Sequence, residues 1–359
     1  MSRRLTMKRS AWVGGLMLLS SCSMIDDDLS NCTYQAEMNY ELRLVTNINT
    51  ELTTELTTKT DLKVAEELRD HLSDVFTDFA HDVDLSFYDT QGDSARLQHD
   101  EHFMDANQAS YTLNLPMRQY MHLATANILD NPLVTLEDDD HCHPARLHQI
   151  ERDTIDSHTT GIFTARQPMD VKEGVDQNFH VRLYMANCAA ALVIDPRGHS
   201  TEGIQVYATG FATGFNICDS VFTFSEKSPI IRTTRLEPKD GDSEVAFCCV
   251  TFPSRELSQP AETRTIIETE EPFVAEEGEE SLWEFRVYVP TPTSIREGTR
   301  AEDSYTQSII NIKEVQRAGE MTVVKVYMGE KGTIESDDSR IGISVTLDWK
   351  PGNTYTPEV

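Results

Sequence analysis

The residues best suited to chemistry form one short run, Asp138-Asp139-Asp140-His141-Cys142-His143. Carboxylates, imidazoles and thiolates are ligands for zinc and copper. Neighbouring residues seldom converge on one tetrahedral ion, however, so this spacing favours a polar loop between strands. We therefore expect no cofactor and no metal ion, and we keep His141, Cys142 and His143 only for a third hypothesis, a metal-dependent surface enzyme. The segment His99-Asp100-Glu101-His102 offers similar ligands with the same weakness.

Other catalytic signatures are absent from the sequence. It contains no Gly-x-Ser-x-Gly, His-Glu-x-x-His, phosphate loop or Gly-x-Gly-x-x-Gly motif, which would mark common hydrolases and nucleotide-binding proteins. Its 60 Asp and Glu residues against 31 Lys and Arg give a formal charge of −29. This balance excludes a nucleic-acid binder, because phosphate recognition uses clustered basic residues. We therefore predict a non-catalytic protein whose partners are proteins, glycans or cations.

Cys22 is the one cysteine for which the sequence predicts a modification. A basic start and an uncharged run at residues 11–19 precede Leu19-Ser20-Ser21-Cys22. A nine-residue helix is about 14 Å long and cannot cross a hydrocarbon layer of about 30 Å, so residues 1–21 are predicted to be a signal peptide. The last four residues resemble the bacterial lipobox, whose cysteine is acylated. A plain secretory signal with a chance cysteine is the alternative.

Residues 22–31 form an acidic tether between the predicted lipid and the body. Asp26-Asp27-Asp28 resembles the surface-export tag of Bacteroidetes lipoproteins, and a solvated acidic linker is the alternative. More than one acyl chain suffices for stable membrane attachment, and no later segment approaches 18 apolar residues, so we expect no transmembrane helix. We predict a lipid-anchored outer-membrane protein at the cell surface, although a periplasm-facing body stays open.

Alternation of apolar and polar residues predicts a chain built mainly from strands. Residues 34–44 alternate cleanly, which indicates a half-buried strand. Apolar residues then recur at three- and four-residue spacing from Val64 to Phe79, which predicts an amphipathic helix packed on a sheet. Further strands are predicted at residues 83–87, 111–115 and 120–128. This order predicts a mainly β domain with one covering helix.

The polar, turn-rich stretch at residues 167–177 marks the predicted domain boundary, so the two domains run from 32 to 170 and from 175 to 359. The second half opens with another alternating strand at residues 179–185. Short strands follow without a long helical stretch, which is typical of a β-sandwich. In the last strand five apolar residues share one face: Ile341, Ile343, Val345, Leu347 and Trp349.

Seven cysteines are present, and six remain when Cys22 is set aside. An exported location permits disulfides, but six cysteines allow fifteen connectivities and the sequence does not choose among them. Cys248 and Cys249 are adjacent, so on a strand they point to opposite faces. We expect some of the six to be free and buried as small hydrophobic residues.

Five short segments besides the lipobox carry a recognisable pattern: Asp28-Leu29-Ser30-Asn31-Cys32, residues 83–92, Leu115-Pro116-Met117-Arg118-Gln119-Tyr120, Leu183-Tyr184-Met185-Ala186-Asn187 and Asp348-Trp349-Lys350-Pro351-Gly352. Together they resemble the FimB/Mfa2 family of fimbrial anchor lipoproteins of Bacteroidales. The resemblance implies two tandem transthyretin-like β-sandwich domains and a non-catalytic role, in which the lipoprotein holds the base of a fimbria to the outer membrane and limits its length. Arg118 departs from the family, which usually has Gly in this turn, and residues 50–60 and 255–280 have no counterpart in it.

The favoured hypothesis is therefore a fimbrial anchor or accessory subunit that binds fimbrial shaft or accessory subunits. Such subunits can be joined by strand addition, in which an extended segment completes another subunit's open sheet. The last strand, Ile341–Trp349, is the candidate for this joint, as donor or as acceptor. The alternative is a surface glycan-binding lipoprotein with exposed aromatic residues such as Tyr88, Tyr111, Trp283 and Trp349. The alternation of Trp349 with Ile and Leu nevertheless favours a core position for its ring.

Overall fold

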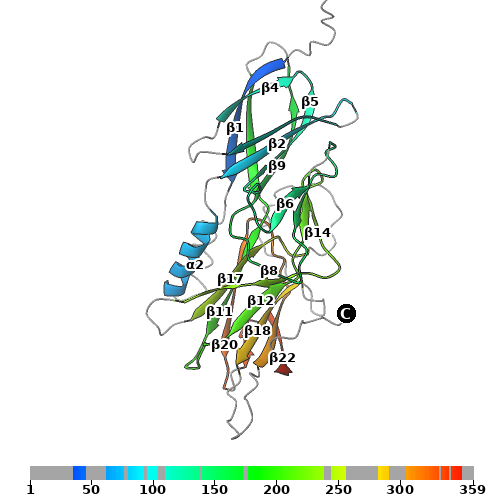
Figure 1. Ribbon diagram of the computed structural model, residues 1–359. Helices are drawn as coiled ribbons and strands as arrows, with labels where there is room; N and C mark the ends of the chain where they lie inside the picture. The colour runs from blue at the N-terminus through cyan, green and yellow to red at the C-terminus, as the bar shows by residue number, and fades with distance from the viewer. Residues whose placement is uncertain are drawn as a thin grey trace, which may run out of the picture.

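The computed structural model describes residues 35–45, 62–76, 80–92, 95–103, 110–137, 140–172, 177–237, 244–255, 282–290, 305–330, 333–338 and 341–349. The described chain is mainly β, with one α-helix, and forms two units stacked end to end (Figure 1). The predicted signal peptide, the acidic tether and Cys22 lie outside the described residues. Within the described ranges, no helix combines the length and the apolar composition needed to span a bilayer.

The first unit is one seven-stranded sheet with the strand order β3-β2-β5-β9-β10-β1-β4. Its strands are β1 (Gln35–Val45), β2 (Asp82–Asp89), β3 (Arg96–Phe103), β4 (Ser110–Pro116), β5 (Gln119–Ala126), β9 (Phe163–Asp170) and β10 (Gln177–Met185). The alternation predicted for β1 is confirmed, because Met38, Tyr40 and Leu42 are buried while the residues between them are exposed. The Tyr40 hydroxyl hydrogen-bonds His122 on β5, although β9 and β10 separate the two strands in the sheet. The sheet therefore folds over its own core.

The turn between β4 and β5 contains Arg118, at the position where the family that the sequence resembles usually has Gly. The residues with positive φ include Asn127, Arg197 and Ser220 but not Arg118, so this turn needs no left-handed backbone there. The Arg118 guanidinium instead donates to the buried Asp89 carboxylate at 2.6 Å. The departure from the family pattern thus adds an ion pair without straining the backbone.

The second unit is a sandwich of two sheets. The five-stranded sheet has the order β16-β17-β11-β20-β21, and the six-stranded sheet has the order β22-β19-β18-β12-β15-β8. The first contains β11 (Cys188–Asp195), β16 (Thr234–Leu236), β17 (Val245–Thr251), β20 (Met321–Met328) and β21 (Ile334–Glu335). The second contains β8 (Thr154–Asp156), β12 (Gln205–Thr209), β15 (Ile230–Arg232), β18 (Trp283–Pro290), β19 (Tyr305–Ile312) and β22 (Ile341–Trp349). Leu192, Phe247 and Val324 of the first sheet share a buried core with Phe285 and Ile310 of the second.

A small four-stranded sheet lies where the two units meet, with the order β14-β13-β7-β6. Its strands are β6 (Val134–Glu137), β7 (Arg146–Gln149), β13 (Gly214–Asn216) and β14 (Val221–Thr223). A disulfide between Cys142 and Cys218 joins the loop before β7 to the β13–β14 hairpin. β8 also crosses over to pair with β15. The two halves of the chain are therefore interleaved rather than simply consecutive.

The sequence places the domain boundary between residues 170 and 175, whereas the chain changes sheets at Ala186 and Asn187. β10, predicted to open the second domain, pairs in parallel with β1 from Met38 to Val45 and also pairs with β9. An alternating pattern shows that a strand has one buried face, but it does not show which sheet the strand joins. β10 consequently completes the first sheet.

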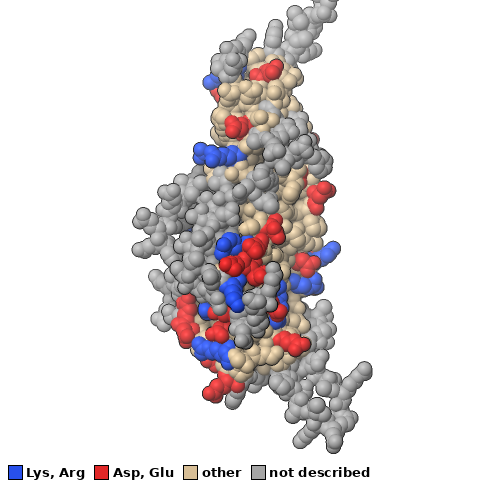
Figure 2. Space-filling model, turned by 90° about the vertical axis from the view of Figure 1, so that its left-hand side faces the viewer, with Lys and Arg blue, Asp and Glu red and all other residues tan. Residues whose placement is uncertain are grey.

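The helix α2 (Leu62–Val75) has the predicted apolar stripe, because Val64, Leu68 and Leu72 are buried. The sequence predicts that it covers the first domain, whereas α2 contacts β16 and β17 and lies beside the second unit (Figure 1). Small residues on the face of the five-stranded sheet that meets α2, such as Ala191 and Cys248, share a buried core with the helix and allow it to approach closely. The outer side of α2 is charged, and Figure 2 shows acidic and basic side chains mixed over this face.

The substitution Leu68→Ala is expected to lower the free energy of unfolding by about 2–5 kcal/mol, because Leu68 is fully buried between α2 and the second unit. Urea unfolding measures the loss. The matched control is Glu66→Ala on the exposed side of the same helix, which should change stability by less than about 0.5 kcal/mol. Equal effects of the two substitutions would show that α2 is not packed in this way.

Three cysteines on the five-stranded sheet are free, as some were expected to be: Cys188, Cys248 and Cys249. Cys248 packs in the core under α2 and Cys249 in the core between the two sheets, which confirms that they point to opposite faces. Burial raises the pKa of the Cys249 thiol to about 12. These thiols therefore stay protonated and serve as small core residues.

Candidate docking edge

The last predicted strand forms β22 and lies at one edge of the six-stranded sheet. Among the described strands, β22 pairs only with β19, in an antiparallel ladder from Ile312 opposite Ile341 to Tyr305 opposite Trp349. Ile341 packs against the core of the second unit, while the side chains of residues 342–349, including Trp349, lie outside the description. β22 thus offers one row of backbone donors and acceptors for which no described strand supplies partners.

The ladder between β19 and β22 contains one irregularity. Gln307 stands opposite Thr346 and Tyr305 opposite Trp349, so Leu347 and Asp348 together face Thr306. Two residues against one define a β-bulge, which bends the strand and increases its local twist. Natural edge strands use such bulges to limit indiscriminate pairing. The straight part of the edge available for pairing is therefore residues 341–346.

β22 and the start of β1 lie at opposite ends of the molecule. Gln35 at the start of β1 pairs with Pro116, and Val45 at its end pairs with Tyr184, just before the chain crosses into the second unit. β1 therefore runs from the far end of the first unit toward the junction. Figure 1 shows the elongated molecule with β1 in the upper unit and β22 at the lower end.

Two of the four aromatic residues that the glycan-binding alternative requires at the surface are core residues. Tyr88 and Trp283 are each 1% exposed, and the Trp283 indole N–H donates to the Glu314 carbonyl at 2.9 Å. A glycan-binding platform needs a ring presented to solvent, so neither residue can serve as one. The alternative fails at these two residues because both lie where sheets pack on their neighbours, and the side chains of Tyr111 and Trp349 lie outside the description.

The candidate metal ligands are brought only partly together. Cys142 is bonded to Cys218, and a disulfide sulfur is not a thiolate ligand. His143 and Asp219 approach Cys218, with 3.4 Å between His143 Nδ1 and Asp219 Oδ1, and both are exposed. His141 forms an isolated bridge with Ala95 instead. Asp138 and Asp139 lie outside the description, and the described part of the group reduces to one imidazole and one carboxylate, which is too few for a zinc site.

Comparison with known proteins finds similarity in structure only. No family model and no curated protein matches the sequence. A candidate adhesin from Bacteroides ovatus aligns at 12% identity over 89% of this chain and 97% of its own, with a TM-score of 0.50. The chain shares the fold of this protein.

Two other solved structures align over a similar length. The fimbrial anchor protein Mfa2 from Porphyromonas gingivalis aligns at 11% identity over 88% of this chain and 100% of its own, with a TM-score of 0.44. A candidate polysaccharide-binding protein from Bacteroides thetaiotaomicron aligns at 9% identity over 89% and 99%, with a TM-score of 0.47. The structural neighbours of this chain thus include fimbrial and adhesin-like proteins of Bacteroidales.

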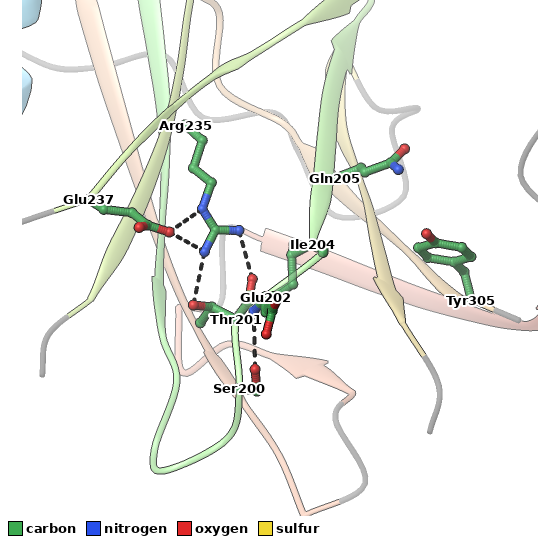
Figure 3. A pocket seen from close by; sticks show the side chains of 9 residues that line it. Ser200, Thr201, Glu202, Ile204, Gln205, Arg235, Glu237 and Tyr305 are labelled. Carbon is green, nitrogen blue, oxygen red and sulfur yellow. Dashed lines mark hydrogen bonds and ion pairs between the residues drawn. The ribbon is translucent and has the colours of Figure 1, made fainter. Parts of the chain in front are cut away.

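An open hollow of about 620 Å³ lies at the end of the second unit beside Tyr305 (Figure 3). Its cation, Arg235, donates to the Thr201 carbonyl at 2.7 Å and to Thr201 Oγ1 at 3.0 Å, and it also binds Glu237. These bonds hold the loop before β12 against β16. Because its donors are occupied within the protein, Arg235 acts as a clamp on this loop rather than as a ligand-binding group.

Two histidines are buried in the described chain where sequence reasoning found no signal. His122 donates from Nδ1 to the Ser86 carbonyl at 3.0 Å and accepts from the Tyr40 hydroxyl. His158 lies 2.9 Å from the Gln149 amide oxygen. Burial lowers the pKa of each to about 4. Both are therefore neutral at pH 7 and act as structural groups.

Proposed function

We propose that this protein is a non-catalytic, lipid-anchored outer-membrane protein that holds a fimbria, or acts as its accessory subunit, at the cell surface. The observation that carries the proposal is the open edge of β22 at the end of the molecule opposite the start of β1. The family-like sequence patterns and the lipobox support the same role. In this proposal, acyl chains on Cys22 hold one end, and β22 holds fimbrial shaft or accessory subunits at the other.

The joint that we propose is strand addition to β22 as an intact edge. An incoming extended segment would pair its backbone with the outer side of residues 341–346, which gives affinity without requiring one particular sequence. Donation of β22 to a partner would instead break its ladder with β19 and remove Ile341 from the core of the second unit. Acceptance leaves both intact, so we favour the acceptor role.

The direct test is co-purification of the mature protein with the fimbrial subunits encoded beside it, together with mass spectrometry of its N-terminus. We expect a stable complex with at least one shaft or accessory subunit, and acyl groups on Cys22. Failure to bind any such subunit, combined with unchanged fimbriae in a deletion strain, would contradict the proposed role. If the protein binds such a subunit but its own mature N-terminus carries no acyl group, only the lipid-anchoring part of the proposal is contradicted.

Proline substitution along β22 is expected to separate binding from folding. In an antiparallel strand, successive residues direct their backbone groups to opposite sides, so of Ser344 and Val345 one faces β19 and the other faces outward. Proline at the outward position removes only an exposed donor. It should weaken partner binding at least tenfold with little change in stability, whereas proline at the inward position should cost about 1–3 kcal/mol.

Each variant serves as the control for the other, with binding measured by surface plasmon resonance and stability by urea unfolding. The acceptor role of β22 is ruled out if neither proline weakens binding in a protein that remains folded.

A further inference from the structure

β20 provides a second open edge, in the other sheet of the second unit. It pairs with β11 from Met321 to Tyr327, but β21 covers only Tyr327 and Met328 on its other side. The Gly329 N–H donates to the Thr333 carbonyl at 2.8 Å, so alternate residues before Gly329 direct their backbone groups to the β21 side. Val323 and Lys325 therefore present N–H and C=O groups to an edge where no described strand lies.

A cavity of about 360 Å³ adjoins this edge. Val323 gives it apolar surface on the same face of β20 as Lys325 and Tyr327, and residues on both sides of β20 complete it. On one side Asp195 ends β11 and Arg197 follows it, and on the other side Asp337 and Asp338 follow β21. The Arg197 guanidinium lies 3.4 Å from the centre of the Tyr327 ring, whose hydroxyl donates to Asp337 at 3.2 Å. The walls are thus held in place from within the protein.

The charge of the cavity favours a cation. Its lining holds three carboxylates, Asp195, Asp337 and Asp338, and two cations, Arg197 and Lys325. Lys325 also forms an ion pair with Glu244, outside the cavity. The lining therefore holds one more carboxylate than cations, and one of these cations is also paired with Glu244 outside the cavity, so the excess negative charge attracts a basic group.

We propose that the free edge of β20 and this cavity bind an extended segment of a partner protein that carries a lysine or arginine. The segment would pair its backbone with Val323 and Lys325. Because cross-strand neighbours share a face of the sheet, the residue opposite Val323 would direct its side chain toward the cavity. The alkyl stem of that residue would rest on valine and its charged end would lie near Asp337. This site is separate from β22, which belongs to the other sheet.

The test uses a labelled nine-residue peptide of alternating threonine and valine with one central lysine, titrated into the mature protein by fluorescence anisotropy. We expect the lysine peptide to bind at least tenfold more tightly than the same peptide with glutamate. Asp337→Asn should remove most of this preference, whereas Asp153→Asn, at a distant exposed carboxylate, should not. N-methylation of alternate backbone nitrogens in the peptide should abolish binding without any change to the protein.

Equal binding of the lysine and glutamate peptides, unchanged binding after N-methylation, or no saturation at about millimolar peptide would each overturn the proposal. The β22 proline variant that blocks fimbrial partners should bind the lysine peptide normally. If the protein binds the lysine peptide but no fimbrial subunit, only the proposed function is contradicted. If it binds a fimbrial subunit but not the lysine peptide, only the proposed site at β20 is contradicted.

Discussion

Lowering the pH from 7.5 to 4.5 is expected to reduce the free energy of unfolding by about 5 kcal/mol through His122 and His158. Burial lowers the pKa of each imidazole from 6.5 to about 4 in the folded protein. Between these values the unfolded chain binds protons that the folded chain excludes, so stability falls as the pH drops below about 6.5. Each histidine contributes about 2–3 kcal/mol of the loss by pH 4.5, and the loss levels off below pH 4.

Urea unfolding at a series of pH values measures this dependence. The variant His158→Gln should lose stability at pH 7.5, because the replacement packs less well beside Phe252, yet its stability should fall only about half as steeply between pH 6.5 and 4.5. His81, which is exposed, supplies the matched substitution, since His81→Gln leaves both buried imidazoles in place. A wild-type profile that is flat over this range would show that the two imidazoles are not buried in the neutral form.

Replacing both Cys142 and Cys218 by serine is expected to lower the free energy of unfolding by about 4 kcal/mol. The disulfide spans 76 residues, and a cross-link that closes so long a loop removes much of the conformational entropy of the unfolded chain. The closed loop contains β9, β10 and β11, and therefore the crossing between the two units. Its loss should lower stability and loosen the small sheet at the junction.

Reduction provides the control for this prediction. A thiol reductant should lower the unfolding midpoint of the wild-type protein to that of the double variant and leave the variant unchanged. The free cysteines within the described ranges do not complicate the result, because Cys188, Cys248 and Cys249 are buried thiols under both conditions. Identical stability of the oxidised and reduced wild type would mean that the bond does not constrain the unfolded chain.

Local pattern was sufficient to predict the features of this fold that depend on neighbouring residues. The alternation in β1, the apolar stripe of α2 and the opposite faces of Cys248 and Cys249 all follow from the periodicity of one element. The edge candidate Ile341–Trp349 is likewise one element, and the structure forms it with the predicted bounds. The mainly β class follows because such patterns recur throughout the chain.

Features that depend on which elements meet could not be predicted in this way. The stripe of α2 and the alternation of β10 are equally compatible with either unit, so their partners were assigned wrongly by position in the chain. The pairing of Cys142 with Cys218 depends on two loops 76 residues apart, and Trp283 is buried by strands distant in sequence. The cavity beside β20 was missed for the same reason, since its lining residues lie in or directly after three different strands, β11, β20 and β21.

The position of α2 also determines when this protein can finish folding. The helix belongs to the first quarter of the chain, but Cys248 and Val323, which share its core, come from strands much nearer the C-terminus. Because a polypeptide is synthesised from its N-terminus, the apolar stripe of α2 stays exposed until those strands have been made. A nascent or prematurely terminated chain therefore exposes apolar surface, and each half of the chain alone lacks packing and pairing partners that the other half supplies.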